Sequence, residues 1–177
     1  MLFIGFICLY QLNLSTWLIA ISVLPLVILY PLAKRFTKWP QIILGLTFSW
    51  AVPTAWSSAN EKWNLGILIM YLATVLWIIG YDTIYGCQDK NEDEIFGIKN
   101  SAVSAKNFLT LFVGCAYSLM FILLSISGYL LKTSIFWYVG VSICGLHLVR
   151  QVIKLKNIEQ NNPLQIFKSN VLSLIHI

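Results

Sequence analysis

The chain has 177 residues, of which 58% are hydrophobic and only 11% are charged, and its mean hydropathy is +0.77. Soluble domains usually carry about a quarter of charged residues, so this composition excludes an ordinary soluble protein and indicates a membrane protein. The net charge of +5 does not indicate nucleic-acid binding, because the basic residues lie in short segments between apolar runs, as in the positive-inside pattern.

The apolar runs predict an all-α fold, a multi-pass transmembrane helical bundle of about six spans. The first run, 2–12, is shorter than the roughly 20 residues that cross a bilayer, and it reads as the second half of a cut helix. Pro40 suits the first position of a helix, and Pro53 is expected to kink that helix. The remaining spans are predicted at 16–30, 40–56, 64–80, 107–127 and 134–149.

Residues 1–177 are expected to form one integral-membrane domain that is truncated at both ends, since the half-length run at the start has a counterpart in an apolar tail, 170–177, that stops after eight residues. Ten of the 12 Lys and Arg residues fall in three alternate connecting segments, 31–40, 81–106 and 150–169. The positive-inside rule therefore places these three segments on the cytoplasmic or matrix side of the membrane.

The segment 81–106 is a polar island that holds five of the seven acidic residues. If it is helical, the carboxylates of Asp82, Asp89 and Asp93 project from one face, because they are seven and four residues apart. Clustered carboxylates repel one another unless a cation neutralises them. Mg²⁺ suits such a site, since it binds one or two carboxylates together with substrate phosphates.

Basic side chains accompany these acids, namely Lys90 and Lys99 within the island and Lys34 and Arg35 in the segment 31–40. Together they favour a site for a Mg²⁺-bound diphosphate at the mouth of a helical bundle, with a hydrocarbon tail among the helices. A solvated connector is the alternative, with Asp82 capping a helix. The carboxylates recur at a spacing that would place them on one helical face, and tyrosines at 81 and 85 flank them. This pattern favours a diphosphate site over a solvated connector.

Two stretches carry a resemblance to a known family. YDTIYGCQDK at 81–90, followed by Asp93 and by GIKNSA at 97–102, resembles the second aspartate-rich motif of the UbiA superfamily of intramembrane prenyltransferases. The match is closest to the 4-hydroxybenzoate polyprenyltransferase branch, which the YPLAKRFTKWPQ stretch at 30–41 also resembles. Gly86 and Cys87 replace commoner residues of the motif, and Asn100 stands where Ser is usual.

The resemblance implies nine spans in the family, of which about six lie here, and a Mg²⁺-dependent aromatic prenyltransferase. Its reaction would join the prenyl group of a polyprenyl diphosphate to the ring of 4-hydroxybenzoate, a step of ubiquinone biosynthesis, in a bacterial inner membrane or a mitochondrial inner membrane. No protein partner is predicted. By the family pattern, catalysis and Mg²⁺ binding are assigned to Asp82, Asp89 and Asp93, and substrate binding to Lys34, Arg35, Tyr85 and Lys99.

The family's first aspartate-rich motif, NDxxDxxxD, has no counterpart in this sequence, so the chain is expected to be inactive alone. Two alternatives remain open. One is a UbiA-type enzyme with another acceptor, such as a naphthoate, homogentisate or haem. The YDTIY and GIKNSA sequences argue against this alternative. The other is a cation carrier or channel subunit whose carboxylates bind the transported ion, which leaves the stretch 30–41 unexplained.

Overall fold

The computed structural model describes residues 5, 10–59, 62–89, 95, 99–105, 108–156 and 162–170, with the backbone alone at Lys34. Throughout this part of the chain the regular elements are helices, which confirms the predicted all-α class. The helices are α2 (Leu14–Ile21), α3 (Leu24–Phe36), α4 (Pro40–Ser49), α5 (Ala51–Ser58), α6 (Leu65–Gly86), α8 (Ser101–Ser104), α9 (Leu109–Leu130), α10 (Ile135–Lys156) and α11 (Pro163–Lys168).

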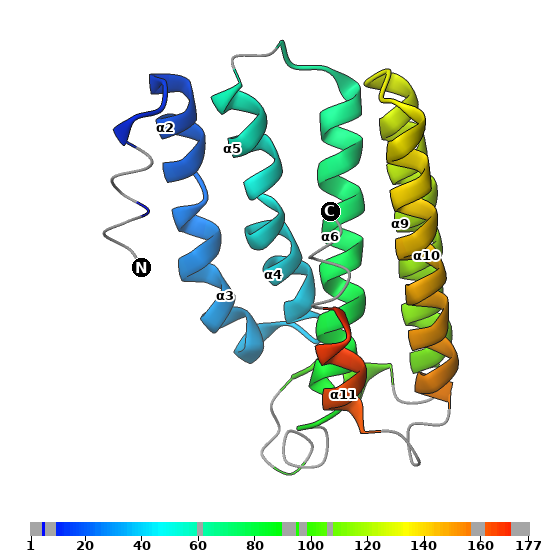
Figure 1. The fold of residues 1–177 in the computed structure, drawn as a ribbon. Helices are drawn as coiled ribbons and strands as arrows, with labels where there is room; N and C mark the ends of the chain where they lie inside the picture. The colour runs from blue at the N-terminus through cyan, green and yellow to red at the C-terminus, as the bar shows by residue number, and fades with distance from the viewer. Residues whose placement is uncertain are drawn as a thin grey trace.

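Four segments of the described chain are long and apolar enough to cross a membrane, so the protein is an integral membrane protein. They are Leu14–Ala33, Leu65–Gly86, Leu109–Leu130 and Ile135–Lys156. The span predicted at 40–56 consists instead of α4 and α5, which lie end to end (Figure 1) and are each too short to cross alone. Of the predicted half-helix 2–12, only residues 5 and 10–12 are described.

The interruption between α4 and α5 falls at Trp50, not at Pro53 itself. The backbone N–H of Trp50 bonds to the carbonyls of Phe48 and Thr47, a tightened turn. Pro53 explains this position, because a proline has no N–H to donate to the carbonyl four residues earlier, that of Ser49, and its ring crowds that carbonyl. The predicted kink is therefore a break one turn before the proline.

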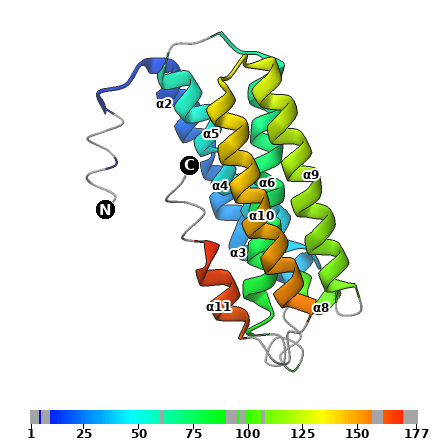
Figure 2. The ribbon, with the colours of Figure 1, turned by 45° about the vertical axis from the view of Figure 1, so that its right-hand side comes forward.

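Helix α6 lies at the centre of the bundle (Figures 1 and 2). It packs along α9 on one side and along α4 on the other, while α10 lies on α9 and the α2–α3 pair lies outside α4 and α5. The approach of α6 to α9 is close at Gly80, where an added Cβ would stand 2.3 Å from the ring of Tyr117. A glycine is therefore required at this crossing.

The three basic segments of the sequence meet at one end of the bundle. Figure 1 shows the α3–α4 connection, the end of α6, the end of α10 and α11 at this end, whereas 62–64 and 131–134 lie at the other end. Helices α6 and α10 continue to Gly86 and Lys156, beyond the predicted 80 and 149. The first residues of the acidic island are thus the last turns of a span. That this end faces the cytoplasm or matrix remains a prediction.

One asparagine both caps α2 and links it to α5. Asn13 accepts a hydrogen bond from Thr16 N at 2.8 Å, which caps α2, and its Nδ2 donates to the carbonyl of Ser57 at 2.9 Å. Asn64 also caps a helix, α6, by accepting from Ile67 N at 3.2 Å. The two residues offer a matched comparison, since the structure gives Asn13 a bond to a second helix as well as a cap.

We expect Asn13→Ala to destabilise the protein more than Asn64→Ala. Both changes remove a cap, which costs about 1 kcal/mol, but the first also leaves the Ser57 carbonyl without this donor, at a further cost of roughly 1–3 kcal/mol. Thermal unfolding in detergent micelles measures the difference. Equal shifts of the unfolding midpoint would show that the α2–α5 bond contributes nothing.

Candidate functional site

The basic segment and the acidic island are joined at the end of the bundle. Lys99 Nζ donates to the carbonyl of Phe36 at 3.3 Å, and Ser104 Oγ donates to the carbonyl of Lys38 at 3.1 Å. Segments about 60 residues apart in the sequence therefore lie side by side. This is the arrangement that the diphosphate-site hypothesis needs.

A buried pair of amides forms the core of this junction. Gln41, in the first turn of α4, is 5% exposed, and Asn100, the N-cap of α8, is 7% exposed. Gln41 Nε2 donates to Asn100 Oδ1 at 2.9 Å, and Gln41 Oε1 accepts from Ser101 N at 3.1 Å. Asn100 Nδ2 in turn donates to the carbonyl of Gly86 at 3.2 Å. One polar chain thus links α4, α8 and the C-terminus of α6.

Two hydroxyls extend the junction into the core. Thr83 Oγ1 and Ser101 Oγ lie 2.7 Å apart, and both side chains are fully buried. Thr83 Oγ1 also donates to the carbonyl of Ile79 at 2.7 Å. The short helix α8 is therefore attached to α6 by side-chain hydrogen bonds. In addition, Ala102 N donates to Asn100 Oδ1 at 3.0 Å, which caps α8.

The predicted metal ligands do not share one helical face. Asp82 lies inside α6 and is partly buried, whereas α6 ends at Gly86 and Asp89 follows in a bend. Asp82 and Asp89 therefore do not lie on one continuous helix, because α6 ends between them at its C-cap, Cys87. Asp82 also does not cap α6, whose N-cap is Asn64, so the capping alternative fails. Asp93 lies outside the described residues.

Asp82 instead has two tyrosine hydroxyls as electrostatic neighbours. Its carboxylate lies within electrostatic range of the hydroxyl of Tyr30, near the end of α3, and of Tyr81. Within the described ranges, no three His, Cys, Asp or Glu side chains come together as a metal-binding group. The assignment of Asp82, Asp89 and Asp93 to a metal stays a prediction.

Arg35 and Lys99 lie at the same end of the bundle as Asp82 and Asp89. Arg35 is exposed in the last turn of α3, next to Lys34, and Lys99 is partly buried where it bonds to Phe36. Tyr85 is 38% exposed at the end of α6. The structure thus places the described candidates at the same end of the bundle, while their roles remain predictions.

Helix α11 covers the tyrosines of the motif. The ring of Phe167 lies 4.8 Å from that of Tyr85 and 5.8 Å from that of Tyr81. Gln151 of α10, 2% exposed, holds this region by donating to Ser169 Oγ at 2.8 Å and accepting from Tyr117 at 3.3 Å. The C-terminal part of the chain therefore forms a wall of the site.

The sequence analysis assigned no role in the site to Gln41, although this residue ends the family-like stretch 30–41, and none to Gln151 or Phe167. For Gln41 a signal existed, since an uncharged polar residue directly after Pro40 interrupts an otherwise apolar helix start. Gln151 has a similar signal, near the end of an apolar run. The role of Phe167 comes from its ring contacts with a distant helix, α6.

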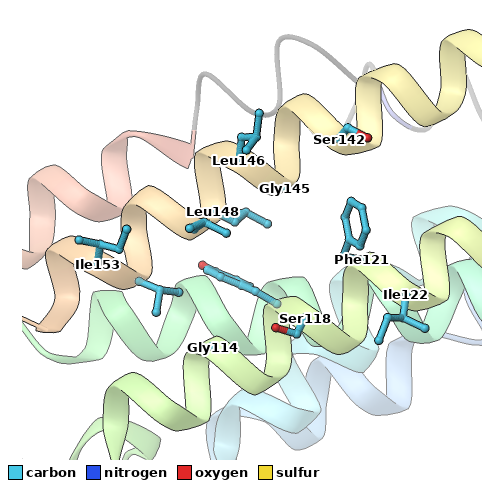
Figure 3. A pocket seen from close by; sticks show the side chains of 12 residues that line it. Gly114, Ser118, Phe121, Ile122, Ser142, Gly145, Leu146, Leu148 and Ile153 are labelled. Carbon is cyan, nitrogen blue, oxygen red and sulfur yellow. The ribbon is translucent and has the colours of Figure 1, made fainter.

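Two apolar hollows adjoin the bundle core. One, of about 390 Å³, lies between α5, α6, α9 and α10 and is lined by residues that include Trp77, Gly140 and Cys144. The other, of about 650 Å³, is a groove between α9 and α10 that passes Gly114 and Gly145 (Figure 3). Leu148 lines both hollows and separates them. The bundle therefore offers apolar space between its helices, and the smaller hollow meets α6 at Met70–Trp77, on the side of the motif away from the polar end.

Residues 1–174 match the UbiA prenyltransferase family. The chain belongs to this family. It is 39% identical over 167 residues to a 4-hydroxybenzoate octaprenyltransferase of Francisella tularensis subsp. novicida (strain U112), a match that covers 94% of this chain and 59% of the relative. A mitochondrial 4-hydroxybenzoate polyprenyltransferase of Dictyostelium discoideum is 37% identical over 158 residues, which are 86% of this chain and 33% of that protein.

These comparisons confirm the resemblance inferred from the two motif stretches. The UbiA chain described here spans about 59% of the length of the bacterial relative. No solved structure matches it.

The close packing of Gly86 against Asn100 generates a prediction. A Cβ at residue 86 would stand 2.6 Å from Asn100 Oδ1, so we expect Gly86→Ala to destabilise the UbiA protein by roughly 1–3 kcal/mol. Shortening the partner makes room, so Gly86→Ala combined with Asn100→Ser should cost less than the sum of the two single changes. Thermal unfolding of the four proteins in one detergent measures this coupling. Additive shifts would contradict the predicted clash.

Proposed function

We propose that the protein containing this chain transfers a polyprenyl group from polyprenyl diphosphate to the ring of 4-hydroxybenzoate. The observation that carries the proposal is the meeting of the basic segment and the acidic motif at one end of a membrane bundle, through the Gln41–Asn100 junction. The apolar cavity further along α6, which Trp77 lines, suits a lipid tail. The names of relatives at 37–39% identity point to the same reaction.

The proposed site would bind the diphosphate from two sides. Asp82, Asp89 and Asp93 supply carboxylate oxygens, a donor set that fits Mg²⁺, and bound Mg²⁺ would neutralise charge on the leaving diphosphate. Arg35 and Lys99, which lie at the same end, are placed to pair with the remaining phosphate oxygens. Lys34, beside Arg35 in the sequence, is assigned the same role.

The reaction breaks the allylic C–O bond of the lipid diphosphate, and the diphosphate leaves with the bonding electrons. The ring carbon ortho to the phenol hydroxyl forms the new C–C bond and then loses its proton. The residues of the chain stabilise the departing charge and exclude water, which would otherwise capture the cation-like carbon. No covalent bond to the protein is needed.

Aromatic residues connect the motif to the apolar cavity. Trp77 lines the cavity and its ring lies 5.8 Å from that of Tyr81, one turn further along α6. Phe167 then contacts both Tyr81 and Tyr85. We assign this path to the first isoprene units of the donor, whose diphosphate stays at the polar end.

The proposed location is a bacterial or mitochondrial inner membrane, with the motif end toward the cytoplasm or matrix, as the distribution of Lys and Arg favours. We further propose that prenyl transfer needs residues beyond these 177, as the length of the relatives suggests. Other acceptors, such as a naphthoate, homogentisate or haem, are tested alongside. Membership of a prenyltransferase family leaves the cation-carrier alternative without support.

The first test is Mg²⁺-dependent transfer in membranes that contain the protein as its gene encodes it. With geranyl diphosphate and 4-hydroxybenzoate, we expect a prenylated product that disappears on chelation. Asp82→Asn, Asp89→Asn and Asp93→Asn should each lower kcat about 100-fold or more, because a preorganised charge at the leaving group is lost. Glu159→Gln, outside the acidic island, is the control.

Product formed only from another acceptor would reject 4-hydroxybenzoate and retain prenyl transfer. Full activity of all three asparagine variants would reject the proposed site. Activity of the isolated 177 residues would reject the proposal that further residues are needed.

The cavity supplies a second test. Gly140 lines it, and no atom of the described structure lies within 4 Å of an added Cβ there. We expect Gly140→Phe to raise KM for an octaprenyl donor about tenfold while leaving KM for geranyl diphosphate within about twofold, because only the longer tail needs the filled space; tenfold corresponds to about 1.4 kcal/mol. Val139→Phe, on the exposed side of the same turn, is the matched control. Equal effects on both donors would place the tail elsewhere.

A further inference from the structure

Gln41 uses both ends of its amide at a place where the two motif segments meet. Its Nε2 donates to Asn100 Oδ1 and its Oε1 accepts from Ser101 N, at 2.9 and 3.1 Å. The side chain is 5% exposed and Ser101 is fully buried. Water therefore has little access to replace these bonds, and a buried amide that loses its partners is left unsatisfied.

Each segment that Gln41 joins carries a charged candidate. On its own side, the α3–α4 connection follows Arg35. On the other side, Ser101 and Asn100 follow Lys99, and Asn100 bonds to the carbonyl of Gly86, three residues before Asp89. The outer bonds between the segments, from Lys99 to Phe36 and from Ser104 to Lys38, lie nearer the solvent. Gln41 is thus the buried centre of the connection.

We propose that Gln41 is a positioning residue, which fixes the separation of the basic segment from the acidic motif and thereby sets the affinity for the Mg²⁺–diphosphate group. It touches none of the reacting atoms. Diphosphate bound between cations and carboxylates responds steeply to their spacing, since misplacement by about 1 Å can cost 100-fold in rate. The identity of the ligand, a Mg²⁺–diphosphate group, rests on the proposed function. The coupling of the two segments rests on the hydrogen bonds alone.

The test uses Gln41→Leu, which keeps the volume and removes both bonds, and Gln41→Asn, which keeps the amide but shortens it by one methylene. Gln165→Leu, at an exposed position of α11, is the matched control. Hydrogen–deuterium exchange is measured in detergent on the protein as its gene encodes it. In Gln41→Leu, the amides of 99–105 and 37–39 should exchange roughly five- to tenfold faster, the equivalent of a lost net hydrogen bond, while α9 and α10 stay unchanged.

Kinetics supply the second readout. Gln41→Leu should raise KM for geranyl diphosphate and the Mg²⁺ concentration for half-maximal rate about tenfold, with KM for 4-hydroxybenzoate within about twofold, and Gln41→Asn should fall between. The effects of Gln41→Leu and Asn100→Ala on these constants should be less than additive, because both changes remove the Gln41–Asn100 bond. A general loss of stability would instead change all constants alike or lower only the active fraction.

The outcomes separate the two proposals. If the wild-type protein forms no prenylated product, the proposed function fails, and the exchange data still decide the coupling. Unchanged exchange in 99–105 and 37–39 overturns the inference, as does faster exchange confined to one of the two segments. Faster exchange in both with unchanged KM and Mg²⁺ dependence overturns the positioning role. Should Gln41→Leu fail to fold, Gln41→Asn answers the same questions.

Discussion

The structure of this protein depends on satisfying polar groups at the end of an apolar bundle. In a bilayer each unpaired backbone group costs several kcal/mol, so helices that end near the hydrocarbon region need partners for their last carbonyls. At the end of α6 that partner is the side chain of Asn100, which bonds to the carbonyl of Gly86. Asn100 is held by Gln41, and the same amide pair starts α8 and joins α4. The polar site is therefore a consequence of how the helix ends are completed.

This arrangement separates two environments over a short distance. Asp82 lies one turn from the end of α6, whereas Trp77, five residues earlier on the same helix, lines an apolar cavity. A single helix thus presents a charged group to the polar end and an aromatic wall to the membrane interior. An amphiphilic substrate with a diphosphate head and a hydrocarbon tail has the complementary distribution of charge. The position of α11 over Tyr81 and Tyr85 narrows the space between these environments.

At a few small residues, side chains from neighbouring segments pack directly against the backbone of α6. Gly80 admits the ring of Tyr117, and Gly86 admits the amide of Asn100. Both lie on α6, which explains why this helix can be central, since neighbours approach its backbone directly. Residues 86 and 100 depart from the commoner motif together, and in the structure they touch. The two departures, which the sequence presents as independent, form one packing unit.

The sequence by itself determined the class of the protein, most of its spans and its family. Long apolar runs can satisfy their backbone only as helices in a membrane, and the two motif stretches carry the resemblance that the family match confirms. Helix ends were harder to predict. The sequence predicts a polar loop from Tyr81 onward, but the residues up to Gly86 form the last turns of α6. Their polar side chains find partners at the end of the bundle. The break at Trp50 came one turn before the proline that causes it, because a proline acts on an earlier carbonyl.

Only the tertiary structure decided which side chains assemble the site. Asp82 and Asp89 were expected on one helical face, but α6 ends between them, and a spacing rule holds only while a helix continues. Gln41, Gln151 and Phe167 gained their roles from partners 59, 18 or more than 80 residues away. Such contacts depend on which helices are neighbours in the bundle. No local pattern of residues encodes that choice, since it follows from the packing of all the helices at once.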